Sequence, residues 1–470
     1  MKSINVNQNI IDLEYAVRGP IPQRAAILKE QGKKIIPCNI GNPQALGQKP
    51  ITFYREVLSF LENPNLINRE KYISKYPISD FENISNHAVE VSETLLTKME
   101  TGLGAYTDSK GYYFIRESIA KFIDKRDCID SSKSNLQSNP DNIFLTDGAS
   151  EGAKAILELL ITKKNDGIMI PIPQYPLYSA TIKRCGGTQV NYYPEEDNGW
   201  TLNKEILDES IQKAKRNKID VKAIVVINPG NPTGAILDKS SIMQVIDFAE
   251  ENDLAIIADE VYQENLYGGT FISFAKSIID RNILLFSLHS VSKGFYGECG
   301  QRGGYLEVRN SPSINNSTLS FIELLFKVSS VNLCSNTIGQ TLVYLLVNPP
   351  QKGSDVFDKF KIEKQTILDD LYTKATIIRK SFEKMDGMEC FGNIGALYLF
   401  PRINKLPPNC TDFEYCMNLL EETGLCVVNG SGFGQKPGTH HLRIAFLPSI
   451  ELLKNVLPNW IEFHNKFVNQ

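Results

Sequence analysis

The stretch that decides the fold is residues 286–305, FSLHSVSKGFYGECGQRGGY. The apolar run 283–286 leads into it and predicts a buried strand, and five glycines follow within it. Glycine lets the backbone turn sharply and approach a ligand closely. The side chains with strong donor groups are Ser290, Ser292, Lys293 and Arg302. We therefore expect a ligand-binding loop at the end of a strand.

The chemistry of these groups indicates a phosphate and a carbonyl compound. Two hydroxyls and a guanidinium suit a phosphate, because they are short donors beside a planar fork. A lysine held among them could form an imine with a carbonyl compound. Phosphate binding and a lysine imine together indicate pyridoxal 5′-phosphate (PLP). The alternative is a solvated Gly/Ser loop with an ordinary surface lysine, so the remaining sequence must separate the two.

Composition excludes several classes of protein. The chain has 470 residues, 42% of them hydrophobic and 22% charged, which is typical of a globular protein with two domains. A net charge of −4 gives no electrostatic reason to expect nucleic acid or an anionic membrane as a partner. No apolar run approaches the ~18 residues of a membrane helix. The first nine residues show no targeting pattern, so we expect a cytoplasmic protein.

Cysteine and histidine are placed in a way that argues against metal binding. The nine cysteines occur singly, without a Cys-x-x-Cys pair, which is unlike a disulfide framework or a cysteine zinc site. Among the five histidines only His440 and His441 are adjacent, and adjacent residues on a strand point to opposite faces. We therefore expect no metal.

From residue 142 onward, strand and helix patterns alternate. Buried strands are predicted at 143–145, 168–170, 223–227 and 254–257. Amphipathic helices are predicted at 153–160 and 242–249. The alternation predicts an α/β fold with a mostly parallel sheet covered on both faces. Polar clusters follow the strands at their carboxyl ends, where such sheets bind ligands.

The segments before residue 142 are less regular. Prolines in 18–22 predict an extended arm, because proline disfavours helix in the preceding residue. A short strand is expected at 35–40, a helix at 53–61 and a helical connection over 62–100. Two loops are expected, a Gly-rich one at 102–111 and a solvated one at 131–139.

After residue 345 the pattern is typical of an α+β domain. A long helix is predicted at 355–385 and a terminal helix at 450–467, with short strands at 396–400, 425–428 and 442–446 between them. We divide the chain into residues 1–70 (an N-terminal arm and part of a small domain), 71–345 (a large PLP-binding domain) and 346–470 (a small C-terminal domain).

Several further residues could serve a cofactor or its substrate. Ser150 follows Asp147-Gly-Ala at a helix start, which suits a phosphate or an ordinary N-cap. Asp259 ends a buried strand, where a pyridinium or a structural ion pair would compensate its charge. Arg443, on an apolar strand, suits a carboxylate clamp or a cross-strand ion pair. Asn231 and Tyr262 could bind the phenolic oxygen of a PLP ring and Tyr175 could stack on it, although each could equally be a turn or core residue.

The ordered motifs resemble those of the aspartate-aminotransferase-like PLP enzymes of fold type I. These motifs are NPGNPTG at 228–234, DEVY at 259–262 and SVSK at 290–293 followed by Arg302. Four others look like the alanine aminotransferase subfamily: GNP at 41–43 with GQKPIT at 47–52, PIPQYPLY at 171–178, SLHSVSKG at 287–294 and GSGFGQK at 430–436. The resemblance covers essentially the whole chain. It implies a large domain with a mostly parallel seven-stranded sheet covered by helices, plus a smaller α+β domain.

The resemblance also implies a role for each candidate residue. Lys293 would be the Schiff-base lysine and the proton shuttle. Asp259 would pair with the pyridinium, Asn231 and Tyr262 with the phenolic oxygen, and Tyr175 would stack on the ring. The phosphate would be held by Ala149, Ser150, Ser290, Ser292 and Arg302. Arg443 would bind the substrate α-carboxylate, with Gly41 and Asn231 nearby. Tyr106 would reach the phosphate of the neighbouring subunit, which implies a homodimer with shared active sites.

The implied reaction is a ping-pong transamination of L-alanine and 2-oxoglutarate to pyruvate and L-glutamate. Glutamate:glyoxylate transamination and a PLP lyase, such as an aminocyclopropane-carboxylate synthase, are the alternatives on this fold. Two features depart from the subfamily pattern: Asn42-Pro43, where animal enzymes have an acidic residue and alanine, and the loop 131–139. A nicotinamide dehydrogenase is disfavoured, because no Gly-x-Gly-x-x-Gly links a strand to a helix.

Overall fold

The structure is a computed structural model that describes residues 4–13, 18–75, 84–129, 137–315 and 317–470. The chain forms two compact units. Unit 1 comprises Met1–Gly47, Ala153–Ser287 and Asp370–Gln470, and unit 2 comprises Gln48–Gly152 and Leu288–Asp369. The units cut across the predicted segments 1–70, 71–345 and 346–470, whose boundaries stay a prediction. Among the described residues, no helix is long and apolar enough to cross a membrane.

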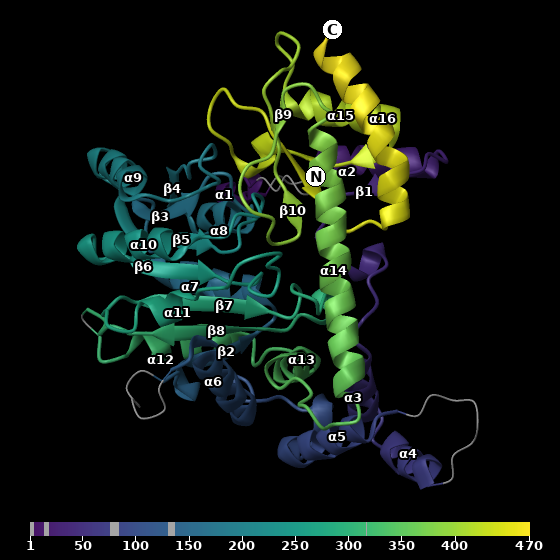
Figure 1. Ribbon diagram of the computed structural model, residues 1–470. Coiled ribbons are helices and arrows are strands. Elements are labelled where there is room, and N and C mark those ends of the chain that lie inside the picture. Colours follow the sequence, from purple (N-terminus) through teal and green to yellow (C-terminus); the bar gives the residue numbers. More distant parts are fainter. Residues whose placement is uncertain (1–3, 14–17, 76–83, 130–136, 316) are drawn as a thin grey trace. The chain divides into compact units, whose positions relative to one another are not determined.

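The main sheet has seven strands in the order β2-β8-β7-β6-β5-β3-β4 (Figure 1). In that order they are Ile143–Thr146, Gly304–Arg309, Leu285–Ser290, Ala255–Asp259, Asp220–Ile227, Asp166–Pro171 and Thr188–Tyr192. β3 runs parallel to β4 and β5, and β5 parallel to β6, whereas β2 and β8 are antiparallel. The predicted α/β fold with a mostly parallel seven-stranded sheet is therefore confirmed. Two of its strands, β4 and β8, were not predicted from the sequence.

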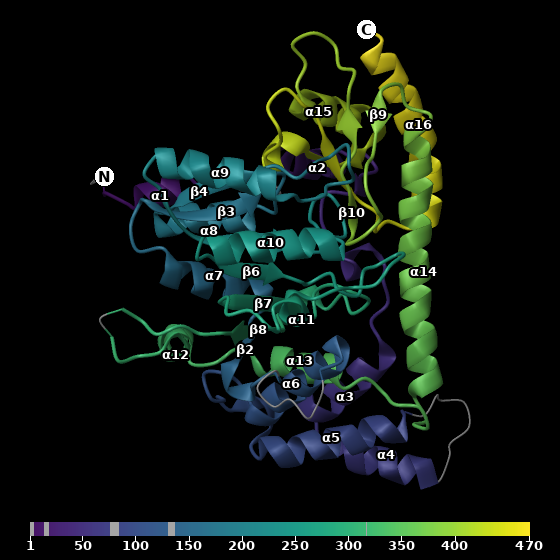
Figure 2. The same cartoon turned by 60° about the vertical axis from the view of Figure 1, so that its left-hand side comes forward.

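In unit 1 the helices α9 (Lys204–Arg216) and α10 (Lys239–Glu251) lie along the sheet (Figure 2). The Asp238 side chain accepts a hydrogen bond from the Ser241 backbone N–H and thereby begins α10. The buried face of α10 includes Ile242, Val245, Ile246 and Ala249, spaced three or four residues apart, and it packs with β5 and β6 in one core. Each fully buried Ile or Val contributes about 1.5–3 kcal/mol. This packing fixes the carboxyl ends of β5 and β6, where the polar motifs begin.

The remainder of unit 1 contains short strands and further helices. β1 (Ile36–Pro37) pairs with β12 (Leu425–Cys426), and β9 (Met388–Glu389) pairs with β11 (Arg402–Ile403). A small sheet has the order β10-β14-β13, which are Tyr398–Leu399, Leu442–Ala445 and Val428–Asn429. The further helices include α8 (Leu177–Cys185), α15 (Asp412–Thr423) and α16 (Ile450–Val468). The predicted strands after residue 345 are present but shorter than expected.

Unit 2 is built on helices that pack around β2 and β8. They are α3 (Thr52–Glu62), α4 (Asn65–Lys75), α5 (Asn86–Met99), α6 (Tyr113–Asp127), α12 (Phe321–Val331) and α13 (Thr337–Val347). Their core includes Val57, Leu95, Ile119 and Leu346, all nearly inaccessible to solvent. The long helix α14 (Phe357–Phe382) confirms the helix predicted at 355–385. The helix at 53–61 is also confirmed, and the helical connection expected over 62–100 is confirmed at α4 and α5, while residues 76–83 lie outside the described part of the chain.

Three expectations from the sequence need correction. The arm at 18–22 is wrong, because α2 begins at Pro20 and extends to Glu30. Proline is well suited to the first turn of a helix, where its missing N–H costs nothing. The strand predicted at 283–286 instead runs to Ser290, so that serine ends β7. Most of the predicted loop 131–139 lies outside the described residues, but Ser138 is buried and donates to the Glu307 carboxylate rather than to solvent.

Candidate functional site

Asp259 stands at the carboxyl end of β6, as the sequence predicted. The residue is 5% exposed, and its Oδ2 accepts a hydrogen bond of 2.8 Å from the Tyr178 hydroxyl. Burial, and then the Asp259 charge, raise the pKa of Tyr178 well above its usual value. Tyr178 therefore stays a phenol and a hydrogen-bond donor, which supports the ionised form of Asp259. A buried carboxylate of this kind can hold a protonated pyridine nitrogen.

Asn231 and Tyr262 are brought together, with Asn231 Nδ2 at 3.4 Å from the Tyr262 hydroxyl. Asn231 is carried by the loop after β5, which is closed by a hydrogen bond from Gly230 N–H to the Ala235 carbonyl (2.8 Å). Burial, followed by the neighbouring Tyr398, raises the pKa of Tyr262 well above its usual value. Both side chains can thus donate a hydrogen bond to a phenolic oxygen. Tyr175 lies half-buried between β3 and α8.

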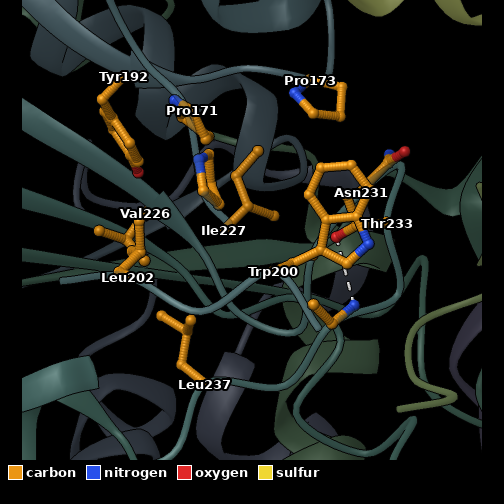
Figure 3. A pocket seen from close by; sticks show the side chains of 13 residues that line it. Pro171, Pro173, Tyr192, Trp200, Leu202, Val226, Ile227, Asn231, Thr233 and Leu237 are labelled. Carbon is orange, nitrogen blue, oxygen red and sulfur yellow. Dashed lines mark hydrogen bonds between the residues drawn. The ribbon is translucent and has the colours of Figure 1, made fainter. Parts of the chain in front are cut away.

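A small cavity of about 40 Å³ lies under the loop that carries Asn231 (Figure 3). Pro171, Val226 and Leu237 give it a mostly apolar lining, and the Trp200 indole lies beside Thr233, whose hydroxyl accepts from the Ala235 N–H at 3.3 Å. This volume suits about one water molecule. This cavity is therefore too small for a cofactor.

Arg443 is a nearly inaccessible cation on β14, 1% exposed. Its Nη1 donates to Asn231 Oδ1 (3.1 Å) and its Nη2 to the Asn39 carbonyl (2.6 Å). The guanidinium lies between two rings, 4.2 Å from the centre of Tyr398 and 4.5 Å from that of Phe433. Within the described part of the chain its Nε has no hydrogen-bond partner and no carboxylate pairs with it. The cross-strand ion pair considered from the sequence is thus not seen there.

An uncompensated buried charge costs several kcal/mol, so a bound carboxylate would stabilise Arg443 strongly.

Gly41 belongs to the same group of residues as Arg443 and Tyr398. A Cβ at this position would stand 1.9 Å from the Tyr398 hydroxyl, so only glycine fits there. The three predicted substrate-binding residues Gly41, Asn231 and Arg443 therefore gather around one another, with Tyr398 between two of them.

A second group of predicted residues gathers in unit 2. Ser290 ends β7, and its Oγ donates to the Gly303 carbonyl (3.0 Å) and lies 3.0 Å from Ser292 Oγ. Arg302 adopts a left-handed conformation with φ of 53°. Its guanidinium contacts Ser292 Oγ at 3.4 Å and Ser150 Oγ at 3.2 Å. Three hydroxyls and one guanidinium thus converge on one place.

The surroundings of Arg302 suit an anion. Ala149 and Ser150 begin α7 (Ala149–Leu160), and a helix N-terminus attracts negative charge. Gly148 leaves room for the guanidinium, since a Cβ there would lie 2.5 Å from Arg302 Nη2. No acidic side chain pairs with Arg302 in the described residues of the chain. This group fits a phosphate, and Lys293 lies half-buried next to Ser292 in the sequence.

The structure thus fits PLP at the level of each unit: unit 1 supplies a buried carboxylate and phenols for the ring, and unit 2 supplies a cradle for the phosphate. Tyr106 is not a member of either group and is 79% exposed, so its role toward a partner subunit stays a prediction. The individual roles of Lys293 and Tyr175 likewise stay predictions. Sequence reasoning missed Tyr178, Tyr398, Phe433 and the Asn39 carbonyl. Two of them had a sequence signal, because Tyr178 lies in the motif at 171–178 and Phe433 in the motif at 430–436.

Comparison with known proteins gives consistent results. Residues 76–457 match the family described as aminotransferase class I and II. A probable mitochondrial alanine aminotransferase of Dictyostelium discoideum is 40% identical over 99% of this chain and 89% of that protein. Glutamate–glyoxylate aminotransferase 2 of Arabidopsis thaliana is also 40% identical, over 99% and 96%.

Two more proteins help to interpret the match. An alanine aminotransferase from Pyrococcus furiosus superimposes with a TM-score of 0.77 at 25% identity, covering 98% of this chain and 100% of that chain. A Saccharomyces cerevisiae protein named inactive alanine aminotransferase is 38% identical over 99% of this chain and 94% of its own length. High overall identity is therefore shared by active and inactive proteins, and the site residues carry the argument for catalysis.

Proposed function

This chain belongs to the aminotransferase class I and II family, and we propose that it is a PLP-dependent alanine aminotransferase. It would transfer the amino group of L-alanine to 2-oxoglutarate and give pyruvate and L-glutamate. Relatives named as alanine aminotransferases match nearly its full length. Alternation between the two substrate pairs at one site is the ping-pong mechanism expected for this reaction.

The buried Arg443 guanidinium carries the proposal. Alanine, pyruvate, glutamate and 2-oxoglutarate all have a carboxylate next to the reacting carbon. The guanidinium is held by Asn231 and by the Asn39 carbonyl, and its Nε donates to neither of them. It therefore offers a fixed fork for that carboxylate. Because this contact is common to all four compounds, it orients every substrate in the same way. Selection among them then depends on the rest of the side-chain pocket.

Bound PLP would supply an aldehyde for the substrate amine and a ring that takes up electrons from the reacting carbon. Asp259, with Tyr178 as its donor, would hold a proton at the pyridine nitrogen. Asn231 and Tyr262 would donate to the phenolic oxygen. Arg302, Ser150, Ser290 and Ser292 would hold the phosphate. The Lys293 amine would move the proton between the substrate carbon and the cofactor.

Glutamate–glyoxylate transamination is the second candidate. Two Arabidopsis thaliana proteins with that name are 40% and 39% identical to this chain over 99% of its length, as close as the alanine aminotransferases. The two reactions share the carboxylate fork and the cofactor, and they differ in the side chain of the substrate. The site residues described above therefore serve both.

Cofactor absorbance tests the two candidates directly. Alanine, glutamate, aspartate and glycine are titrated separately into the purified, PLP-loaded protein, and the loss of the aldehyde form is followed. We expect conversion by alanine and glutamate at low concentration, and little by aspartate. Conversion by glutamate and glycine, with alanine inert, would favour the glyoxylate reaction. No conversion by any amino acid, with PLP bound, would contradict transamination itself.

Two further parts of the proposal concern assembly and location. We propose a homodimer in which Tyr106 serves the phosphate of the partner's site, which its high exposure permits. A cytoplasmic location also stays a prediction, and relatives named as mitochondrial make it worth testing by cell fractionation.

A further inference from the structure

His441 lies two residues before Arg443, directly before β14, where it forms an antiparallel bridge with Arg402. Side chains two apart on a strand point to the same face. The residue is 2% exposed. Its ring stacks on Phe400 with centroids 4.8 Å apart and planes 8° apart, and it lies 6.3 Å from the Trp200 ring. Packing on two sides fixes the plane of the imidazole, so its two nitrogens have defined partners.

Each ring nitrogen of His441 lies within hydrogen-bond distance of one side chain. Nε2 lies 2.9 Å from Glu196 Oε1, and Nδ1 lies 2.9 Å from Gln435 Oε1. Gln435 is oriented by Asp412, because its Nε2 donates to Asp412 Oδ2 at 3.1 Å. With the amide nitrogen committed to Asp412, the amide oxygen faces His441. The ring therefore joins Glu196 on one side to Gln435 on the other.

The two carboxylates at the ends of this arrangement are acceptors throughout. Asp412 Oδ2 also accepts from the Ser431 backbone N–H (2.6 Å), and Oδ1 accepts from the Ser431 hydroxyl (2.9 Å). That hydroxyl itself accepts from Asn429 Nδ2, so its own proton is directed to Asp412. Glu196 Oε2 accepts from Arg402 Nη1 at 3.3 Å, and the same guanidinium also pairs with Asp197 and Glu389. Two carboxylates thus anchor the chain of hydrogen bonds that runs through the His441 ring.

These contacts hold the short helical turn η7 (Gly430–Phe433) in place. Its first residue donates from Gly430 N–H to the His441 carbonyl at 2.8 Å, and its second residue is bound to Asp412. Its last residue is Phe433, whose carbonyl accepts from Gln174 N–H (2.8 Å) and whose ring covers one face of the Arg443 guanidinium. His441 therefore contacts the turn through its backbone and, by way of Gln435 and Asp412, through its ring.

We propose that His441, held between Glu196 and Gln435, is a positioning residue for Arg443. It fixes η7 and the Phe433 ring, and they fix the plane of the guanidinium that receives the substrate carboxylate. The inference rests on the proposed function, because it assigns Arg443 to that carboxylate. It adds residues outside contact with substrate or cofactor, and it ties carboxylate affinity to the hydrogen bonds of one histidine.

The test uses His441→Gln in the full-length, PLP-loaded protein. Glutamine is neutral and can reach Glu196 with its amide, but it cannot donate to Gln435 at the same time. The matched control is His440→Gln, the same change in the adjacent residue, whose ring Nδ1 has no hydrogen-bond partner among the described residues. Calorimetry with maleate, a dicarboxylate that does not react, measures carboxylate affinity without turnover, and Arg443→Lys serves as the positive control.

We expect His441→Gln to weaken maleate binding about 10-fold, the effect of one charged hydrogen bond, while His440→Gln binds as the wild type does. kcat/KM for alanine and for 2-oxoglutarate should fall by the same factor, with the change in KM rather than kcat. Equal maleate affinity in the two glutamine variants would overturn the proposal. If alanine proves not to be a substrate, the proposed function fails, but maleate binding still reports on Arg443.

Nitrogen NMR of the wild-type protein with labelled histidine provides the second measurement. The His441 signals are assigned by their loss in His441→Gln or, if that variant does not fold, by their shift in Gln435→Leu. The His441 signals should shift when maleate binds to the wild-type protein, and signals unchanged at saturating maleate would overturn the proposal without any variant being active. Gln435→Leu should reproduce the loss of maleate affinity, and a folded Gln435→Leu protein with unchanged affinity would count equally against the relay.

Discussion

Replacing Arg443 by lysine tests the carboxylate site most directly. Lysine keeps one positive charge but has a single ammonium, so it cannot replace both the Nη1 contact to Asn231 and the Nη2 contact to the Asn39 carbonyl while also gripping a carboxylate. It also lacks the planar guanidinium, whose central carbon lies 4.2 Å from the ring centre of Tyr398 and 4.5 Å from that of Phe433. The substitution should therefore weaken every substrate that has an α-carboxylate.

The magnitude follows from the contacts that are lost. One charged hydrogen bond is worth about 1.5–3 kcal/mol, and a tenfold change in rate corresponds to about 1.4 kcal/mol. kcat/KM should therefore fall about 10- to 150-fold. Because the carboxylate is common to both substrate pairs, the fall should be equal in the alanine and the 2-oxoglutarate half-reactions.

Rapid-mixing absorbance measures each half-reaction separately, first with alanine and the PLP form, then with 2-oxoglutarate and the aminated form. Arg379→Lys is the matched control, since this arginine also donates to two backbone carbonyls, of Gly392 and Cys390, in the same unit. It should leave both half-reactions unchanged. A loss confined to one half-reaction, or a loss of the same size in Arg379→Lys, would refute the role assigned to Arg443.

Four other outcomes can be measured. Lys293→Ala should still bind PLP but lose many orders of magnitude in turnover, and near-normal turnover would exclude its role as proton carrier. Asp259→Asn should keep its thermal unfolding midpoint while turnover collapses; an unfolded protein with residual activity would identify a structural ion pair instead. Burial lowers the pKa of His464 below its usual 6.5, so the unfolded chain takes up a proton at a higher pH than the folded protein does. The free energy of unfolding should therefore decrease as the pH drops below about 6.5. Urea unfolding at about pH 7.5 and about pH 5.5 should show a smaller decrease for His464→Gln than for the wild type. Mixing subunits of Lys293→Ala and Tyr106→Ala should restore about a quarter of wild-type sites if sites are shared, and no gain after confirmed exchange would reject sharing.

The sequence was most informative where one strand pattern ended in a polar residue. Asp259 and Asn231 follow continuous apolar runs, so their positions at the edge of a buried parallel sheet could be predicted from β6 and β5 alone. The sequence predicted a strand that ends at residue 286, whereas β7 continues to Ser290 and places this serine at the strand end. β8 was not predicted, because its alternating polar residues are buried by neighbours that lie far away in the sequence.

Other parts of the site depend on contacts that no local pattern reports. Arg443 is oriented by the carbonyl of Asn39, 404 positions earlier, and by a ring on each face. Tyr398 follows an ordinary strand pattern, and the motif at 430–436 marks Phe433 without indicating what its ring contacts, so the role of both residues appears only when the chain is folded. The helix α2 shows the opposite case, in which a local rule for proline pointed to extended backbone but the position of Pro20 in the first turn made a helix possible.

The close approach of Gly41 to Tyr398 restricts the order in which mutations can accumulate. A side chain at position 41 would meet the Tyr398 hydroxyl at 1.9 Å and its ring carbon Cζ at 2.8 Å. Removing the hydroxyl alone, as in Tyr398→Phe, still leaves the ring carbon too close. Tyr398 must therefore be replaced by a smaller residue before position 41 can gain a side chain, and that first step uncovers one face of Arg443. Evolution toward a different substrate through these two positions has to pass through an intermediate that binds carboxylates poorly, which makes the pair a barrier to divergence.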